Sequence, residues 1–211
     1  MRKLLIVSGA TLLAAGAFAQ TAYWSGALTA NSPTFNRPTS TGGAGGRPGA
    51  AYSVQGFTVT VSGTYTFESS SFSVNGAPTL DTFIFIYSGS FDPNNPTNNF
   101  LAANDDFNGT LSLLPGPYSG VGLTSTGTGS SGTQPSSQVM ASLTAGTQYY
   151  AVQSGWYAAN DTNGRGVGPY WDAIGGGPGT VNLTTVPEPA SMAALGLGAL
   201  ALIRRRKAAK K

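Results

Sequence analysis

The sequence predicts an all-β body, an antiparallel β-sandwich or jelly roll, with a distinct segment at each end of the chain. Three observations lead to this prediction. Short runs of alternating apolar and polar residues recur between residues 20 and 185, and clusters of Gly, Pro and Asn separate them. No stretch of this body shows apolar residues at the 3.6-residue period of a helix. Many short strands joined by turns are typical of two-sheet β folds.

The first 19 residues have the three-part layout of a secretory signal peptide. Arg2 and Lys3 precede an apolar run from Leu4 to Ala15, and Ala17-Phe18-Ala19 supplies small residues at the cleavage positions. Such a layout is read by the export machinery. We therefore expect residues 1–19 to be removed by signal peptidase and the chain to be exported.

The next clear pattern predicts a hairpin with one solvent-facing side. Phe57, Val59 and Val61 alternate with threonines, and after a Ser-Gly turn Tyr65 and Phe67 alternate with polar residues. Two alternating runs joined by a short Gly-containing turn favour adjacent antiparallel strands.

The run from Thr82 to Tyr87 is apolar on both sides of the chain and predicts a central strand covered on both faces. Two low-complexity tracts, Thr39 to Ala50 and Ser125 to Ser137, are expected to be loops within a single domain that spans residues 20–185. The remaining expected strands are Phe100 to Ala102, Thr110 to Leu114, Gln138 to Leu143, Thr147 to Gln153 and Thr180 to Thr185.

Composition limits the chemistry of the body. The whole chain has a formal charge of +3, but residues 20–186 contain only three arginines and seven acidic residues, so the basic excess belongs to the two ends and does not indicate nucleic-acid binding. The chain has no cysteine and no histidine, and the body has no lysine. Disulfides are therefore excluded, and the commonest general base is missing.

The C-terminal segment, residues 186–211, combines three features in a fixed order. Pro187-Glu188-Pro189 comes first, then a mostly apolar run from Ala190 to Ile203, and then a basic cluster. As a helix these 14 residues would span about 21 Å, less than the roughly 30 Å hydrocarbon core of a bilayer. The basic residues that follow, which resist translocation, are Arg204, Arg205, Arg206 and Lys207.

This tail resembles the PEP-CTERM sorting signal. The resemblance implies that the body is followed by a short hydrophobic helix that anchors the chain transiently in the inner membrane until an exosortase removes the tail. It also implies a Gram-negative bacterium that makes exopolysaccharide, and a final location at the cell surface or in the extracellular matrix.

A second resemblance covers much of the body, roughly from Trp24 to Val152. The segments "SPTFNRP", "FTVTVSGTYTF", "DTFIFIYSGSFDPNNPTNNFLAANDD" and "SLTAGTQYYAV" occur in an order similar to secreted bacterial β-sandwich modules of the prepeptidase C-terminal type. This likeness implies a sandwich fold and an accessory role, without a reaction.

The stretch "NDDFNG" is the densest cluster of oxygen ligands. Its candidate calcium ligands are Asn104, Asp105, Asp106 and Asn108, although position twelve of a calcium loop would be Pro115. A cation would need a further carboxylate, such as Asp81 or Asp92. The alternative is a turn in which the Asn and Asp side chains accept hydrogen bonds from the local backbone. The similar stretch "DTNG" at 161–164 is also expected to be such a turn.

Four aromatic residues in Gly-rich, loop-like surroundings form a candidate carbohydrate platform: Trp156, Tyr157, Tyr170 and Trp171. Flat rings can stack on sugar rings, but aromatic residues also bury large areas and close the ends of sandwiches.

The sequence as a whole predicts an exported, non-catalytic component of the cell envelope or extracellular matrix that associates with exopolysaccharide. One alternative is a carbohydrate-binding module for matrix polysaccharide. A third is a secreted hydrolase, which is disfavoured because only carboxylates and hydroxyls remain for catalysis, and Asp105 and Asp106 would face opposite sides of a strand.

Overall fold

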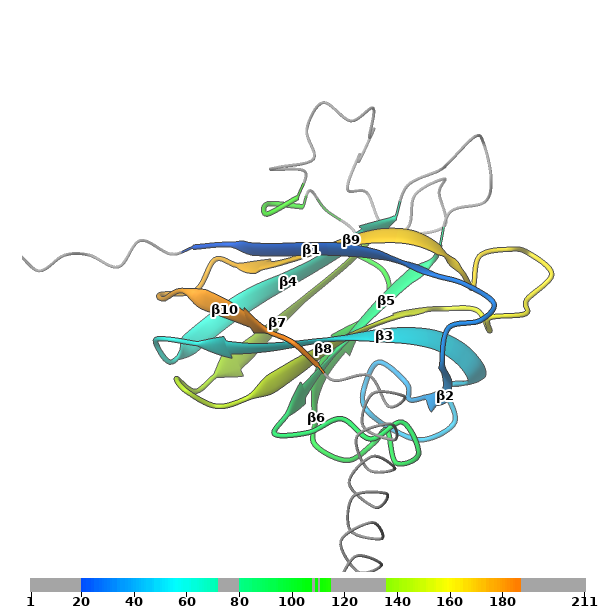
Figure 1. The fold of residues 1–211 in the computed structure, drawn as a ribbon, viewed down its shortest axis with the longest axis horizontal. Coiled ribbons are helices and arrows are strands. Elements are labelled where there is room, and N and C mark those ends of the chain that lie inside the picture. Colours follow the sequence, from blue (N-terminus) through cyan, green and yellow to red (C-terminus); the bar gives the residue numbers. More distant parts are fainter. Residues whose placement is uncertain (1–19, 72–79, 108, 110, 115–135, 187–211) are drawn as a thin grey trace, which may run out of the picture.

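The computed structural model describes residues 20–71, 80–107, 109, 111–114 and 136–186. These residues form ten strands and no helix (Figure 1). The strands are β1 Ala22–Leu28, β2 Thr34–Arg37, β3 Arg47–Val59, β4 Gly63–Ser71, β5 Thr82–Ser88, β6 Phe100–Asn104, β7 Ser137–Leu143, β8 Tyr149–Gly155, β9 Gly168–Gly175 and β10 Val181–Thr184.

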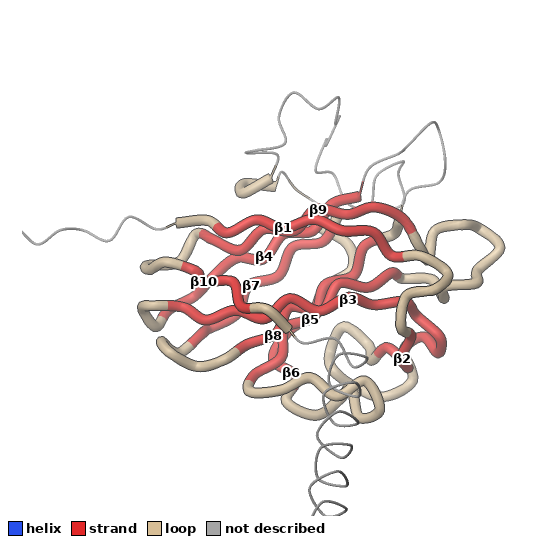
Figure 2. Tube along the Cα trace, in the orientation of Figure 1, coloured by secondary structure: helices blue, strands red, loops and turns tan. Residues whose placement is uncertain are grey.

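The strands build two sheets, and all pairs between named strands are antiparallel (Figures 1 and 2). The four-stranded sheet has the order β1-β9-β4-β7. The six-stranded sheet has the order β10-β3-β8-β5-β6, and β2 adds to β3. The all-β prediction is therefore confirmed.

The main hydrophobic core lies between the two sheets and takes side chains from both. Phe67 of the four-stranded sheet contacts Phe57 of the six-stranded sheet edge to face, with ring centroids 5.5 Å apart. Face-to-face sheets that share one core have the arrangement expected of a sandwich. The buried residues of this core are Phe57, Val59, Tyr65, Phe67, Ile84, Ile86, Ala141, Leu143, Tyr149, Ala151, Ile174 and Val181.

The prediction of a strand covered on both faces at Thr82 to Tyr87 is confirmed. All six residues are buried in β5. Ile84 and Ile86 face the main core, whereas Phe83, Phe85 and Tyr87 face a second cluster on the other side of the six-stranded sheet. Strand β2 and the loop after β5 contribute Phe35 and Phe91 to this cluster, so the outer face is covered as well.

The predicted hairpin is wrong, because its two strands lie in different sheets. β3 belongs to the six-stranded sheet and β4 to the four-stranded sheet, so residues 60–62 cross from one layer to the other. Phe57 and Val59 on one side and Tyr65 and Phe67 on the other all enter the main core. The alternating pattern predicted the inward-facing residues of both strands correctly. The two strands, however, face each other across the core and are not hydrogen-bonded neighbours in one sheet.

Thr110 to Leu114 was also expected to be a strand, and its described residues 111–114 are not one. The carboxylate of buried Glu68 accepts the backbone N–H groups of Ser112, Leu113 and Leu114 at 2.6, 2.8 and 2.9 Å. Three consecutive N–H groups that point at one carboxylate cannot pair with a neighbouring strand. A buried acid on β4 thus fixes this segment as a turn.

The other predicted strands are confirmed with shifted ends, as β6, β7, β8 and β10. The expected loops are shorter than predicted, because β3 begins at Arg47 and β7 at Ser137. Strands β1, β2 and β9 were not predicted. In β9 the sequence Gly168-Pro169 resembles a turn, yet the strand pairs with both β1 and β4.

The expected signal peptide, the C-terminal hydrophobic segment and residues 125–135 of the second low-complexity tract lie outside the described residues. Within the residues that the structure describes, no helix is long and apolar enough to cross a membrane.

Candidate functional site

Trp156 is an exposed aromatic residue that is held by a stack of buried rings. It directly follows β8, and its side chain is 40% exposed. Its ring is nearly parallel to that of Phe83, at 10°, with centroids 6.1 Å apart, and Phe83 stacks in turn on Phe85 at 4.4 Å. Alternate residues of β5 point to one face, so Phe85, Phe83 and Trp156 form a continuous stack of rings. The indole is the last ring of this stack, and its contact with Phe83 holds it in position.

All three arginines of the body converge on Trp156 and Tyr157. The Arg37 guanidinium lies 4.9 Å from the centroid of the Trp156 ring and donates to the Trp156 carbonyl at 3.3 Å. Arg47 donates from Nε to the same carbonyl at 3.4 Å and lies 5.8 Å from the Tyr157 ring. Arg165 lies 5.6 Å from that ring. We call these five residues the Trp156 surface.

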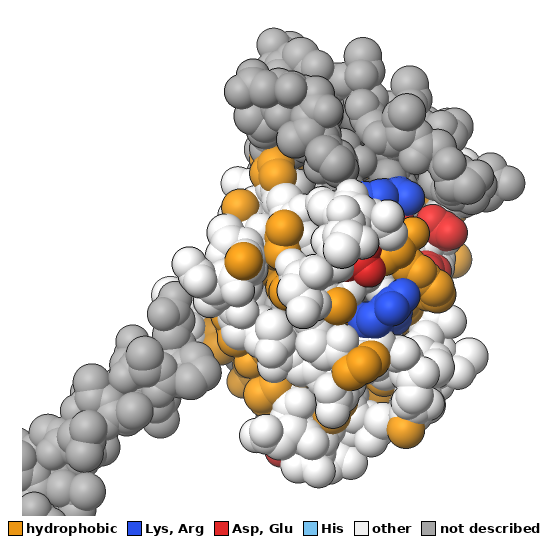
Figure 3. All heavy atoms as spheres, turned by 90° about the vertical axis from the view of Figure 1, so that its right-hand side faces the viewer, with side chains coloured by type: hydrophobic (Ala, Val, Ile, Leu, Met, Phe, Trp, Pro, Cys, Tyr) orange, Lys and Arg blue, Asp and Glu red, His pale blue; other side chains and the backbone are white. Residues whose placement is uncertain are grey.

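Figure 3 shows basic, acidic and hydrophobic side chains gathered together on one face of the molecule. Basic residues are rare in this body, so their convergence on two neighbouring aromatic rings is a specific feature. A guanidinium within about 6 Å of an aromatic ring is attracted by the ring's electron density.

The three arginines differ in how their charge is balanced. Burial lowers the pKa of Arg37 to about 10, and its Nε has no hydrogen-bond partner. Arg165 pairs with Asp81 at 3.2 Å. Burial raises the pKa of Asp81 to about 6, while Arg165 acts in the opposite direction. That pair is the one ion pair in the part of the chain that the structure describes, so Arg47 has no carboxylate partner there. The Arg47 side chain is partly exposed.

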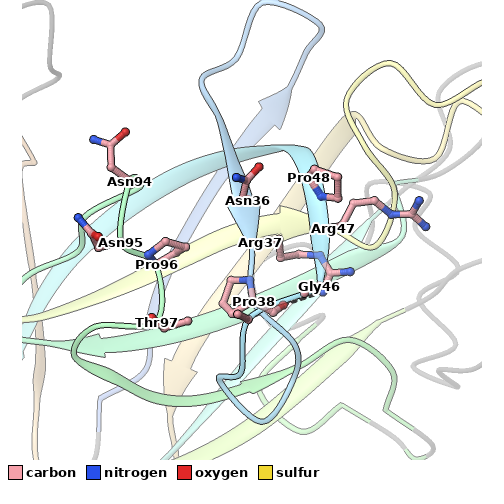
Figure 4. A pocket seen from close by; sticks show the side chains of 12 residues that line it. Asn36, Arg37, Pro38, Gly46, Arg47, Pro48, Asn94, Asn95, Pro96 and Thr97 are labelled. Carbon is pink, nitrogen blue, oxygen red and sulfur yellow. Dashed lines mark hydrogen bonds between the residues drawn. The ribbon is translucent and has the colours of Figure 1, made fainter.

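A pocket of about 460 Å³ adjoins this surface (Figure 4). It lies between the end of β2, the start of β3 and the loop at 94–97, and Arg37 and Arg47 are part of its lining. Figure 4 shows that the Arg47 side chain extends away from the Asn94 and Asn95 side of the pocket. The other polar side chains of the lining are the amides Asn36, Asn94 and Asn95 and the hydroxyl of Thr97. The lining is therefore rich in neutral hydrogen-bonding groups, with cationic groups at one side.

The structure separates the four predicted aromatic residues. Trp156 and Tyr157 lie together, whereas Tyr170 and Trp171 lie in β9 and not in a loop. Tyr170 is only 5% exposed and hydrogen-bonds Ser53 between the sheets at 2.5 Å. Trp171 packs on the outer face of the four-stranded sheet, against a different cluster. Neighbouring residues of a strand point to opposite faces, so these four rings do not form one platform.

Asn104 and Asp105, two of the residues proposed as calcium ligands, make hydrogen bonds within the protein. Asn104 donates to the Gln138 carbonyl at 2.7 Å, and Asp105 accepts the backbone N–H of Asp106 at 2.9 Å. Asn108 lies outside the described residues. Among the residues placed by the structure, no three His, Cys, Asp or Glu side chains gather as a metal-binding group. The "DTNG" stretch is a turn, in which Asp161 accepts the Asn163 N–H.

Sequence reasoning missed the three arginines as site residues. Their scarcity was a usable signal, because a body with only Arg37, Arg47 and Arg165 as cations has few reasons to place them together. Their positions, 37, 47 and 165, are too far apart in the sequence for their proximity to be foreseen.

The sorting residues Pro187, Glu188 and Pro189 and the basic cluster 204–207 lie outside the described residues, and the comparison with protein families addresses them. Residues 185–207 match the PEP-CTERM protein-sorting motif. No curated protein matches the chain. The motif indicates an exported protein that an exosortase processes, with a sorting signal that resides transiently in the membrane.

Proposed function

We propose that the processed protein is a non-catalytic component of the cell envelope or extracellular matrix that associates with exopolysaccharide. The observation that carries this proposal is the convergence of all three body arginines on the exposed Trp156–Tyr157 pair. An exported body that a sorting motif delivers to the envelope meets polysaccharide there. A relationship of the body to accessory modules of the prepeptidase C-terminal type would fit the same role.

The chemistry of the Trp156 surface suits a sugar chain. A fixed, exposed indole offers a flat apolar face on which a sugar ring can stack, and the neighbouring pocket offers amide groups for hydroxyls. Arg47 has no carboxylate partner in the described residues. Its planar guanidinium group has the geometry to donate two hydrogen bonds to one carboxylate. We therefore propose that the preferred polysaccharide carries uronic acids or other carboxylates.

The absence of reaction is part of the proposal. The body contains no histidine, cysteine or lysine, which removes the usual general base and two common nucleophiles.

Binding to purified exopolysaccharide from the producing cells tests the proposal. We expect Trp156→Ala to weaken binding about tenfold, since one ring–ring stacking contact contributes about 1 kcal/mol or more. Trp171→Ala is the matched control, because it removes the same side chain from the opposite sheet. Retained affinity in Trp156→Ala, or equal losses in both folded variants, would contradict a binding role for this surface.

A second arm tests the charge preference. Arg47→Gln should weaken binding to a uronate-containing chain and leave binding to a neutral glucan unchanged. If both polysaccharides bind wild type equally, the carbohydrate role stands and the preference for carboxylates fails.

The state of the mature protein is measured by intact mass from cells, cell surface and medium. A mass that fits a start at Gln20 and an end near Pro187 would establish both processing events, and additional mass would report attachment to a lipid or glycan. Protein in the matrix that still carried the basic tail would contradict the proposed route.

A further inference from the structure

A polar layer continues the main core between the two sheets. Ser69 of β4, Gln153 of β8 and Asp172 of β9 each lie two residues along their strand from a member of the main core, so they face the same interior. Their exposed fractions are 0, 1 and 0%. Three adjoining polar side chains that are fully buried require hydrogen-bond partners, because burial of such groups is otherwise costly.

The geometry places a hydroxyl against an amide. Ser69 Oγ donates to Gln153 Oε1 at 2.8 Å across the two sheets. Gln153 Nε2 donates to the Ser154 carbonyl at 2.9 Å, which fixes the plane of the amide group. The hydroxyl oxygen is thus held beside the amide oxygen, which is bonded to the carbon that a nucleophile would attack.

Asp172 stands next to the hydroxyl. It is the register partner of Ser69 in the β4–β9 pair, so both side chains leave the sheet on the same face. The group is fully buried, and neither carboxylate oxygen has a hydrogen bond of good geometry, although the Ser69 and Trp24 side chains are close enough to interact with it as donors. Burial raises the pKa of this carboxyl to about 8, and nearby Ser69 and Trp24 lower it in part. Near neutral pH most molecules carry this carboxyl in its protonated form, and in the ionised fraction it is a stronger proton acceptor than an ordinary carboxylate.

We propose that Ser69 and Gln153 form an internal ester bond, with Asp172 as the proton carrier. Ser69 Oγ attacks the amide carbon of Gln153 while Asp172 accepts the hydroxyl proton. The C–N bond of the tetrahedral intermediate then breaks, and the nitrogen takes that proton from Asp172 and leaves as ammonia. The new C–O bond replaces the C–N bond, with no oxidant or cofactor involved.

Such a bond would join the two sheets covalently, between residues 84 positions apart in the chain. The chain has no cysteine, so a disulfide cannot serve this purpose. A cross-link across a long loop restricts the unfolded chain in the same way that a disulfide does. The ester would stabilise an exported protein without depending on the redox state of its surroundings.

Digestion at aspartate residues tests the proposal in the mature wild-type protein. Cleavage before Asp81, Asp106 and Asp161 places Ser69 and Gln153 in separate peptides, residues 20–80 and 106–160. We expect one linked species whose mass is lower than the sum of the two peptides by about 17 Da, the ammonia that is lost. Peptide analysis also separates this loss from cyclisation of an N-terminal Gln20, which has the same mass change but leaves the peptides unlinked.

Hydroxylamine provides the chemical signature, because it cleaves an ester and leaves amides intact except at Asn-Gly bonds, which occur in these two peptides at 75–76 and 108–109 and give fragments of known mass. Treatment should release the two peptides, with Gln153 converted to a hydroxamate. Two unlinked peptides at their sequence masses in untreated wild type would overturn the proposal.

Three variants assign the roles. Ser69→Ala should abolish the linked species, and Asp172→Asn should reduce its yield at least tenfold. Ser53→Ala, which removes a hydroxyl from the same layer, should keep it. Linkage that persists in Ser69→Ala would contradict the assignment. If that variant does not fold, the wild-type digest decides the question without it.

Discussion

Asp172 shows what a single buried carboxyl does to the pH dependence of stability. Burial raises its pKa from 3.8 to about 8 in the folded protein. Between these values the folded state keeps a proton that the unfolded state has lost, so the free energy of unfolding falls as the pH rises. The slope that one such group contributes is at most about 1.4 kcal/mol per pH unit.

We predict that Asp172→Asn flattens this dependence, because the amide cannot ionise. Urea unfolding of both proteins at pH 5, 6, 7 and 8 measures it. The wild type should lose stability steadily over this range relative to the variant, with the loss ending above about pH 8. Asp81, whose pKa is raised to about 6, remains in both proteins and cancels in the comparison. Parallel curves for wild type and variant would show that Asp172 is not protonated in the folded state.

Residue identity alone predicted part of the candidate site. Trp156 and Tyr157 could be proposed because aromatic residues in a polar, Gly-rich stretch have little apolar sequence around them. Tyr170 and Trp171 have similar neighbours, yet β9 pairs on both sides and sends one ring into the interior. Strand pairing between distant segments decided the difference, and a single sequence does not contain that pairing.

At the scale of elements, the crossing from β3 to β4 is held by one tyrosine. The Tyr65 hydroxyl donates to the Val61 carbonyl at 2.8 Å and accepts the Gly179 N–H at 3.1 Å, which ties residues 60–62 to the turn before β10. Its ring is fully buried in the main core. Tyr65 of the four-stranded sheet therefore holds both the connection between the sheets and the turn that leads into β10 of the six-stranded sheet.

We predict that Tyr65→Phe lowers the free energy of unfolding by about 1–3 kcal/mol, because the Gly179 N–H loses its buried partner. Tyr150→Phe is the control, since the Tyr150 hydroxyl makes no hydrogen bond within the described residues and its removal should change stability by less than about 0.5 kcal/mol. Urea unfolding measures both. Equal effects would mean that the crossing does not depend on this hydroxyl.

The elements also show where sequence patterns inform and where they do not. Alternation in Phe57 to Phe67 identified the buried side of both strands, because each core-facing residue contributes apolar surface whichever strand lies beside it. It did not identify the neighbour, since a hairpin and a crossing between sheets bury the same side. At 111–114 the apolar residues suggested a strand, but the buried carboxylate of Glu68 from a distant strand takes up their N–H groups.

On the scale of the whole molecule, the basic residues divide between the terminal segments and one surface of the body. Most basic residues belong to the two terminal segments, and the three in the body gather at the Trp156 surface. The sorting motif could be recognised from sequence because an enzyme reads it as a short, ordered set of residues. The proposed polysaccharide partner would leave no such linear pattern.

We predict that deletion of Pro187 to Pro189 leaves the protein in the inner membrane at full tail length. Processing requires the motif, whereas the apolar run and the basic cluster that hold the chain there remain. Fractionation followed by intact mass measures the outcome, with a deletion of Lys210 and Lys211 as a control that should be processed normally. Release of the motif-deleted protein at the normal mature mass would contradict exosortase dependence.

Strand β10 ends at Thr184, three residues before Pro187 of the sorting motif. If the mature chain ends near Pro187, three residues form a tether with a reach of only about 10 Å. Thr184 lies opposite Gly56, which pairs with Tyr150. Trp156, which directly follows β8, is six residues beyond Tyr150, about 20 Å away. The tether is thus too short for the group attached at the C-terminus to cover the Trp156 ring. If the proposed glycan binding holds, one molecule anchored at its C-terminus would hold a glycan at the same time and cross-link the matrix.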